Sequence, residues 1–186
     1  MTPEAPIIGP DVRLDKIAYL SPSAQLYGKI VIREGASIWP NVVMRAEVHE
    51  IRIGERTNIQ DFVMIHVGVQ TPTIVGQDCS ITHHATLHGC TIEDRCLIGI
   101  NATVMDGAVI GENSIVAGQS IVTEASVFPP NSVIAGVPAK RVKTADNAAA
   151  NLANARIYRR NAENYADGLF RMRDRDFRAA TRPNVK

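Results

Sequence analysis

An apolar residue recurs at every sixth position through the second half of the chain. The series runs over eight successive positions in a chain that is 45% hydrophobic: Ile92, Ile98, Val104, Ile110, Val116, Val122, Phe128 and Ile134. An amphipathic helix needs apolar residues three and four apart, and a half-buried strand needs strict alternation. A period of six fits neither. It predicts short strands joined by tight turns, each strand sending one side chain into a narrow core.

The same register occurs in blocks nearer the N-terminus. Steps of six join Leu26, Ile32, Ile38 and Met44, then Ile53, Ile59 and Ile65, then Val75, Ile81 and Leu87. The blocks are separated by nine residues at Met44–Ile53 and ten at Ile65–Val75, and a step of five leads to Ile92. We interpret the longer steps as loops that bulge from a corner. Such repeats stack into a solenoid whose coil is a triangle of three short parallel strands.

The pattern changes after Lys143. Helix formers dominate, and an apolar stripe steps by three or four through Leu152, Ala155, Tyr158, Ala162, Tyr165 and Leu169. It predicts a helix from about 146 to 167, with Thr144 or Asp146 as N-cap, a break near Gly168, and a short second helix near 169–178. We therefore expect a repeat domain over 10–142 and a helical segment over 143–180 packed on it. This segment either seals the open end of the solenoid or contributes to a subunit interface or site.

Charge is distributed unevenly along the chain. Residues 139–186 carry 12 Lys/Arg against 5 Asp/Glu, a net +7, whereas residues 1–138 carry 8 against 14, a net −6. The basic tail lacks a series of stacking aromatics, so we expect a solvated helix on an acidic body and no nucleic-acid partner. The N-terminus has neither a basic start nor a long apolar run, which predicts no membrane segment. Cys79, Cys90 and Cys96 form no C-x-x-C pair, which is typical of reduced thiols in a cytoplasmic protein.

Three of the five histidines lie in the stretch S-I-T-H-H-A-T-L-H-G-C-T-I, residues 80–92. Counting repeats from Met44 places His66 and His88 one coil apart on one face, with Arg45 one coil below His66. Strands on neighbouring coils are about 4.7–4.9 Å apart, so two stacked imidazoles can reach one metal. His83 falls on another face of the triangle, with Asp61 one coil below it.

A metal shared by all three histidines therefore needs more than one chain. A three-fold ring of prisms brings the face of His83 against the face of His66 and His88 at every interface. The register thus predicts a homotrimer with three interfacial sites, provided that the histidines share one metal. Arg45 and Asp61 would face each other across the same interface, and Gln60 could bond a metal-bound water.

Four stretches resemble the gamma-class carbonic anhydrases: V-M-R-A-E at 43–47, T-N-I-Q-D at 57–61, I-H at 65–66 and H-H-A-T-L-H-G-C at 83–90. This resemblance places the chain in the hexapeptide-repeat superfamily and implies a left-handed parallel β-helix. The stretch A-G-V-P-A-K-R-V at 135–142 is also similar to the usual ending of that fold.

The resemblance also implies roles for individual residues. It makes His66, His83 and His88 the ligands of a zinc ion, although Fe²⁺ or Co²⁺ would suit the same ligands. It makes Arg45 and Asp61 an interfacial ion pair, and it places Asn58 and Gln60 near the metal-bound water.

Some positions depart from the family. Glu47 stands where the family usually has Asp. The loop between His66 and Val75 has no carboxylate, whereas the founding type carries a proton shuttle on an acidic loop there. His84 matches a variable position, and His49 matches no site position, so we expect His49 to be a surface residue.

Four functions are consistent with these residues. The first is hydration of carbon dioxide to bicarbonate by zinc-bound hydroxide at the trimer interfaces. The second is zinc-dependent hydrolysis of a coenzyme A thioester. The third is a trimeric scaffold with a weakly active site. The fourth is acyl transfer by a histidine base without a metal, which three converging histidines disfavour.

Overall fold

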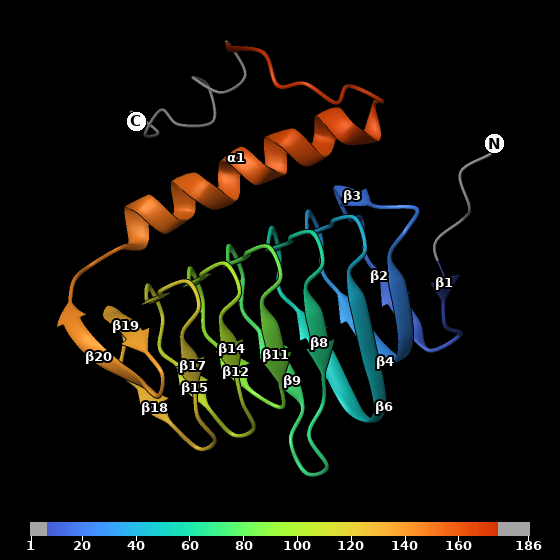
Figure 1. Ribbon diagram of the computed structural model, residues 1–186. Coiled ribbons are helices and arrows are strands. Elements are labelled where there is room, and N and C mark those ends of the chain that lie inside the picture. The colour runs from blue at the N-terminus through green and yellow to red at the C-terminus, as the bar shows by residue number, and fades with distance from the viewer. Residues whose placement is uncertain (1–6, 175–186) are drawn as a thin grey trace.

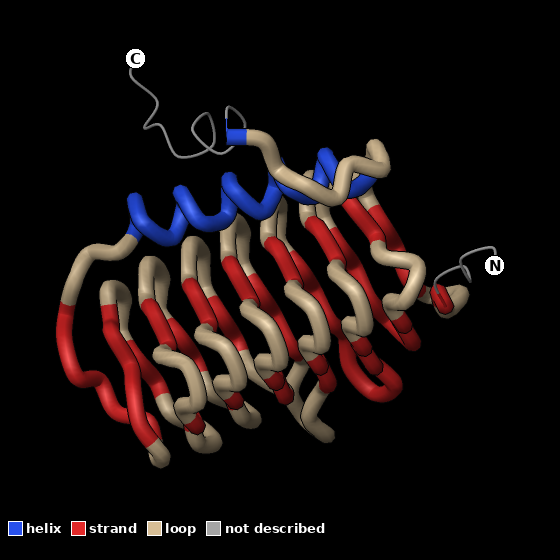
Figure 2. The backbone as a smooth tube through the Cα atoms, turned by 45° about the horizontal axis from the view of Figure 1, so that its top comes forward, coloured by secondary structure: helices blue, strands red, loops and turns tan. Residues whose placement is uncertain are grey.

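The six-residue repeat folds as a three-sided parallel β-helix with one long α-helix beside it (Figure 1). The computed structural model describes residues 7–174. In Figure 2 the strands repeat from coil to coil, and the helix runs along the stack of turns. The fold is therefore mainly β, as the repeat predicts.

Each face of the prism is a ladder of short parallel strands. Face one holds β1 (Ile7–Ile8), the start of β4 (Gln25–Ile32), the start of β6 (Val43–Ile53), β8 (Met64–His66), β11 (Thr86–His88), β14 (Thr103–Val104) and β17 (Ile121–Val122). Face two holds β2 (Val12–Leu14), the ends of β4 and β6, β9 (Thr73–Val75), β12 (Thr91–Ile92), β15 (Val109–Ile110) and β18 (Val127–Phe128). Face three holds β3 (Tyr19–Leu20), β5 (Ser37–Ile38), β7 (Asn58–Ile59), β10 (Ser80–Ile81), β13 (Leu97–Ile98), β16 (Ile115–Val116) and β19 (Ser132–Gly136), which pairs with the antiparallel β20 (Ala139–Thr144).

The core consists of the apolar repeat positions, stacked directly above one another. Pairing joins Met44, Ile65 and Leu87 on face one, Ile53, Val75 and Ile92 on face two, and Ile59, Ile81 and Ile98 on face three. All nine side chains are buried, and each contributes roughly 1.5–3 kcal/mol of burial free energy. The predicted face assignment is therefore confirmed.

The nine-residue step after Met44 is not the loop that its length suggests. Residues 43–53 form one continuous strand, β6, which pairs with β8 on face one and with β9 on face two. The strand β4 runs alongside β6 around the same corner, and a register shift between Gly28 and Ile30 absorbs the extra residues. The ten-residue step does contain a loop, at residues 67–72 between β8 and β9.

The turns depend on residues in the left-handed region. Phe62 and His84, which occupy equivalent corners on neighbouring coils, have φ of 60° and 59°. Non-glycine residues adopt this conformation at a modest cost. Each follows a candidate site residue, because Asp61 precedes Phe62 and His83 precedes His84. The corner therefore presents Asp61 and His83 side by side on successive coils.

The helix α1 (Ala148–Ala166) lies against β3, β5, β7 and β10 of face three. Its N-cap is Asn147, whose side chain makes no capping bond. The predicted N-caps, Thr144 and Asp146, were therefore wrong. Asp146 nonetheless serves the helix start, because its Oδ1 accepts a 3.0 Å hydrogen bond from the Ala148 amide. The helix ends before Gly168, whose φ of 75° suits glycine after a C-cap.

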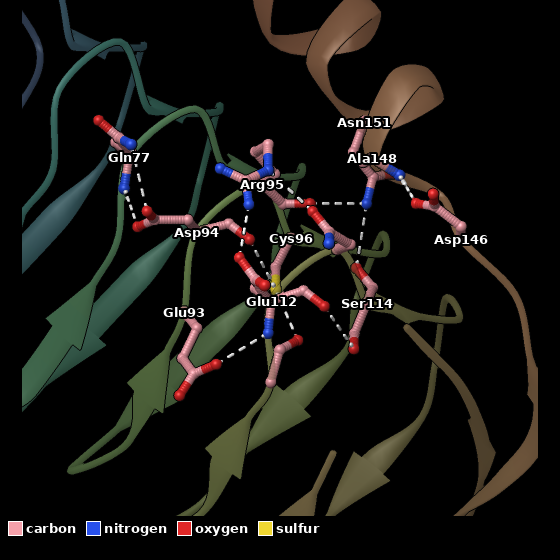
Figure 3. A network of polar contacts seen from close by, with 12 residues as sticks. Gln77, Glu93, Asp94, Arg95, Cys96, Glu112, Ser114, Asp146, Ala148 and Asn151 are labelled. Carbon is pink, nitrogen blue, oxygen red and sulfur yellow. Dashed lines mark hydrogen bonds and ion pairs between the residues drawn. The ribbon is translucent and has the colours of Figure 1, made fainter. Parts of the chain in front are cut away.

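A polar network fixes the start of α1 to the corner between faces two and three (Figure 3). The Asn151 amide donates to the carbonyl oxygens of Arg95, at 2.8 Å, and Ser114, at 3.2 Å. Next to Arg95, Asp94 accepts bonds from the backbone and side chain of Gln77 on the neighbouring coil. Asn151 thus bonds the Arg95 carbonyl and adds a second donor to the Ser114 carbonyl, which already accepts from the Leu97 amide.

The chain turns back after α1. Residues 169–173 are not helical, whereas residue 174 is, so the expected second helix does not start at 169. The rest of that prediction, 175–178, lies outside the described residues. The Leu169 amide bonds the Asn164 carbonyl at 2.8 Å, and Phe170 packs edge-on against Tyr165 at 5.2 Å. Among the described residues, no helix combines the length and apolarity that a membrane crossing requires.

Candidate metal centre

His66 and His88 face each other on adjacent coils of face one. They pair in register with each other, and Arg45 pairs with His66 on the coil below. The Nδ1 atom of His66 lies 3.0 Å from Nε2 of His88. Two nitrogens bound to one zinc at 2.0–2.1 Å with a tetrahedral angle lie about 3.4 Å apart. The two rings are therefore within a few tenths of an ångström of the spacing that shared ligation needs.

The outer nitrogen of each ring is held by a carboxylate. Glu47 Oε2 lies 3.0 Å from Nε2 of His66, and Asp106 Oδ2 lies 2.7 Å from Nδ1 of His88. A carboxylate accepts an N–H from a neutral imidazole, which fixes the tautomer and leaves the facing nitrogens with lone pairs. Two lone pairs 3.0 Å apart repel each other unless a proton or a metal cation lies between them.

Glu47 is also paired with Arg45. One Arg45 nitrogen, Nη1, contacts Glu47 Oε1. Partial burial acts to raise the pKa of Glu47, but hydrogen bonds from its own backbone N–H and from His66, with the charge of Arg45, lower it overall. Glu47 is therefore ionised at neutral pH and remains an acceptor for His66.

Asp106 is fitted tightly into its position. A Cβ on Gly68 or on Gly89 would clash with its Oδ1. The same oxygen accepts a 3.2 Å hydrogen bond from Thr71 in the 67–72 loop. The two glycines thus make room for the carboxylate that orients His88.

His83 lies at the corner of face three, paired with Asp61 on the coil below. Its Nδ1 is 3.0 Å from Asp61 Oδ2, and its Nε2 is 3.3 Å from the Tyr158 hydroxyl on α1. Nδ1–H therefore donates to the carboxylate, and Nε2 accepts from the phenol. Burial, followed by the negative charge of Asp61, raises the pKa of Tyr158, so the phenol keeps its proton.

A relay of side chains fixes the amide of Gln60. Its Nε2 donates to Asn58 Oδ1 at 2.9 Å, and Asn58 in turn donates to Ser80 Oγ at 3.0 Å. Ser80 donates to Asn154 of α1 at 2.8 Å. Gln60 Oε1 is buried without a hydrogen-bond partner. A buried unpaired acceptor is costly, and it indicates a missing donor such as a water molecule.

The candidate residues fall into two groups within one chain. Face one carries Arg45, His66 and His88, and face three carries Asp61 and His83, together with the buried relay of Asn58 and Gln60. Within residues 7–174 of a single chain, no three His, Cys, Asp or Glu side chains converge to hold a metal. Arg45 and Asp61 are likewise apart and pair with neighbours of their own face.

The cysteines near the site are not suited to metal binding. Burial raises the pKa of Cys90 to about 12, and burial likewise raises the pKa of Cys79 well above its usual value. Both remain thiols at neutral pH, and only the thiolate is a metal ligand. Imidazole nitrogens are therefore better suited than these thiols to hold a metal here.

A metal implied by the sequence resemblance fits these donors. Each of His66, His83 and His88 has one ring nitrogen engaged by a carboxylate and the other directed elsewhere. This carboxylate–histidine arrangement typically accompanies histidine ligation in proteins. The unpaired Gln60 oxygen supplies an acceptor for water beside the relay.

Three partners of the histidines were missed by sequence reasoning. Asp106 follows the repeat position Val104 by two, so its register could have placed it beside His88. Tyr158 is 75 residues from His83 in sequence, and no periodic signal connects them. Glu47 was noted as a departure from the family but not as a partner of His66.

Comparisons with known proteins agree with this architecture. Residues 89–124 match the family described as "Bacterial transferase hexapeptide (six repeats)". A solved hexapeptide transferase family protein from Anaplasma phagocytophilum superposes with a TM-score of 0.80 at 29% identity, covering 89% of this chain and 99% of that one.

Two curated relatives are named carbonic anhydrases. "Gamma carbonic anhydrase 1, mitochondrial" from Arabidopsis thaliana is 42% identical over 109 residues, which is 55% of this chain but 38% of that protein. "Probable carbonic anhydrase" from Methanocaldococcus jannaschii is 50% identical over 130 residues, 70% of this chain and 82% of that protein. Such identity over most of the archaeal relative, on a hexapeptide-repeat coil, means that the chain belongs to the gamma-class carbonic anhydrase-like family of hexapeptide-repeat proteins.

Proposed function

We propose that the chain is one subunit of a homotrimeric, zinc-dependent carbonic anhydrase that interconverts carbon dioxide and bicarbonate. The observation that carries this proposal is the pairing of each proposed ligand, His66, His83 and His88, with its own carboxylate. Because His83 lies on a different face from the other two, each metal would be held between neighbouring subunits.

Exposed apolar side chains flank both halves of the proposed site. Phe62 and Ile100, which adjoin Asp61 and His83 at the corner of face three, are 52% and 50% exposed, and Met64 on β8 is 39% exposed. Apolar side chains grouped beside an incomplete site support contact with a second copy of the chain. In that contact Arg45 of one subunit would meet Asp61 of the next, completing a charge-assisted pair.

The chemistry divides between the metal and the protein. Zinc held by three neutral imidazoles would lower the pKa of a water ligand to near 7. Gln60 would accept a hydrogen bond from water through its unpaired Oε1, and Asn58 would hold the Gln60 amide in that orientation. Glu47, Asp61 and Asp106 would keep the three rings in the tautomers that ligation needs.

A second candidate is hydrolysis of a coenzyme A thioester at the same site. A cavity of about 420 Å³ lies between α1 and the segment that follows it, lined by residues that include Tyr158, Asn161, Phe170 and Arg171. Tyr158 joins this cavity to His83 through its hydroxyl. The cavity is far larger than a three-atom substrate requires, and Arg171 would suit an anionic group.

The other candidates remain weaker. A weakly active scaffold would retain the metal without turnover. Acyl transfer is suggested by the family name of the Anaplasma relative, but it needs no arrangement of three carboxylate-bound histidines. The free and buried Cys79, Cys90 and Cys96 support our placement of the protein in the reducing cytoplasm.

One experiment separates these functions. The metal content of the purified protein is measured together with carbon dioxide hydration and acyl-coenzyme A hydrolysis, before and after chelation. We expect about one zinc per chain and hydration that is lost on chelation and restored by zinc. Thioester hydrolysis alone would favour the second candidate. Bound zinc without turnover would favour the scaffold. An active protein that contains no metal would favour acyl transfer.

A further inference from the structure

Another histidine, His49, lies beside the proposed site. It lines a cavity of about 340 Å³ between the first coils and the 67–72 loop. Its wall includes Glu47, His49, Glu50, Lys29, Asp11 and Pro72. Glu47 connects this cavity to His66, because Oε2 of Glu47 is 3.0 Å from the ring. Figure 1 shows β6 curving around this corner next to the loop that joins β8 and β9.

His49 is positioned by the strand that carries the site residues. Arg45, Glu47 and His49 all lie on β6 (Val43–Ile53), which turns the corner between faces one and two. Arg45 and Glu47 form an ion pair, and Glu47 and His49 both line the cavity. The same strand thus leads from the proposed metal centre to His49.

Only one ring nitrogen of His49 is occupied by the protein contacts of the described chain. Its Nε2 lies 3.0 Å from the Val69 carbonyl oxygen. Since a carbonyl only accepts hydrogen bonds, Nε2 carries the proton, and Nδ1 of the neutral ring keeps a lone pair. His49 is partly exposed, so this nitrogen belongs to a ring that borders both the cavity and solvent.

Hydration of carbon dioxide creates a demand for such a group. One carbon dioxide and one water give one bicarbonate and one proton, and this proton must leave the site in every turnover. The 67–72 loop contains no carboxylate that could take it. Imidazole is the side chain whose unperturbed charge change falls between pH 5 and 8.

We infer that His49 is the proton acceptor of the reaction, an inference that rests on the proposed function. A water in the cavity passes the proton to Nδ1 of His49, which forms a new N–H bond. The imidazolium then releases a proton to buffer, and the neutral ring is restored. No oxidant or further reactant is required.

The charges that face His49 are nearly balanced. Asp11, Glu47 and Glu50 contribute three carboxylates to the cavity wall, and Lys29 contributes one ammonium. Lys29 pairs with Glu50 at 3.3 Å, Arg52 also contacts Glu50, and Arg45 contacts Glu47. The ring of His49 therefore takes up a proton through its free Nδ1 atom without a strong local excess of negative charge.

His49 also has a structural role that the test must separate. Its bond to Val69 pins the 67–72 loop, whose Thr71 contacts Asp106. The variant His49→Gln keeps an amide N–H for the Val69 carbonyl but cannot take up a proton at neutral pH. The matched control is Lys16→Gln, which removes an exposed titratable side chain near the first coil, away from the histidines.

The test compares metal-loaded trimers of the unmodified protein and both variants. Steady-state hydration is measured in dilute buffer, and exchange of isotope between carbon dioxide and bicarbonate is measured at chemical equilibrium, where no net proton release occurs. In His49→Gln we expect kcat to fall about tenfold or more, with kcat/KM, the exchange rate and metal content unchanged. Added imidazole buffer should restore kcat, and Lys16→Gln should behave like the unmodified protein.

A readout independent of activity accompanies these rates. The ring C–H signals of His49 in the NMR spectrum, assigned by their absence from His49→Gln, should shift on acidification as the ring takes up a proton. An unchanged kcat, a parallel fall of kcat and exchange, or a ring that stays neutral would each overturn the inference. If the unmodified protein catalyses no exchange, the proposed function fails and the role of His49 fails with it.

Discussion

Asp106 contacts both His88 and the neighbouring loop through its two carboxylate oxygens. Oδ2 lies 2.7 Å from Nδ1 of His88, and Oδ1 accepts a 3.2 Å hydrogen bond from Thr71. One oxygen of the Asp106 carboxylate therefore orients the His88 ring through Nδ1, and the other oxygen holds the loop through Thr71. Ring orientation and loop position are coupled at this residue.

We predict that Asp106→Asn weakens zinc binding by about 10–100-fold, the usual cost of losing a carboxylate behind a histidine ligand. The neutral amide removes the negative charge that raises the basicity of His88, and its NH₂ group can favour the wrong tautomer. Competition with a chromophoric chelator measures the affinity. The matched control is Asp94→Asn, which alters a carboxylate bound to Gln77 at a corner remote from the histidines. Equal losses in both variants would refute a specific effect on His88.

Replacing Gln60 should reduce catalytic activity far more than it changes the stability of the fold. Its Oε1 is buried without a partner, so Gln60→Leu removes an unpaired oxygen while it also removes the donor to Asn58. These effects oppose each other, and we expect the free energy of unfolding to change by less than about 2 kcal/mol. Catalysis should fall about 100-fold with metal content intact, because such preorganised groups act mainly in the transition state. A large loss of stability in denaturant unfolding, with activity retained per folded trimer, would make Gln60 purely structural.

In the proposed site, Tyr158 would compete with the metal for Nε2 of His83. Its hydroxyl lies 3.3 Å from that nitrogen, and its ring meets Trp39 edge-on at 5.7 Å. Tyr158→Phe removes a hydrogen bond with a net value of about 0.5–1.5 kcal/mol, so zinc should bind about two- to tenfold more tightly. Trp39 is the sole tryptophan of the chain, and its fluorescence should change as zinc displaces the hydroxyl in the unmodified protein. Weaker binding by the variant would show that Tyr158 assists the site.

Much of the site's geometry follows from one periodic signal. The six-residue repeat fixes which residues stack, so the columns of Arg45, His66 and His88, and of Asp61 and His83, were predicted correctly. Burial enforces this register, since a slip by one residue would turn every core side chain outward. Counting the six-residue repeats also predicts that the histidines divide between two faces.

Other features have no counterpart in that signal. The continuous β6 replaces an expected loop because β4 and β6 pair around the corner, and pairing between two non-repeating segments leaves no periodic trace. The contact of Tyr158 with His83 depends on how α1 packs across face three, which is a tertiary relationship. Periodicity therefore predicts positions along the coil but not the partners supplied by loops and by the helix.

The division between faces predicts that two inactive variants can complement each other. His83→Ala lacks the ligand of face three, and His66→Ala/His88→Ala lacks both ligands of face one. Each variant alone should bind zinc poorly, because every interface of its homotrimer loses at least one imidazole. When the two are mixed unfolded and refolded together, an intact face one should meet an intact face three at some interfaces. Zinc content and hydration should then partly return.

Recovery must remain incomplete, because other interfaces in the same mixed trimers carry no ligand histidine. Zinc per trimer, measured on mixed species separated by differently charged tags, distinguishes complementation from misfolding of one parent. The control mixes each variant with itself under the same conditions. If tagged mixed trimers form and hold no more zinc than the parents, the ligands come from a single chain. Since His66 and His88 already face each other at 3.0 Å within one chain, that result would require His83 to leave Asp61 and cross to face one.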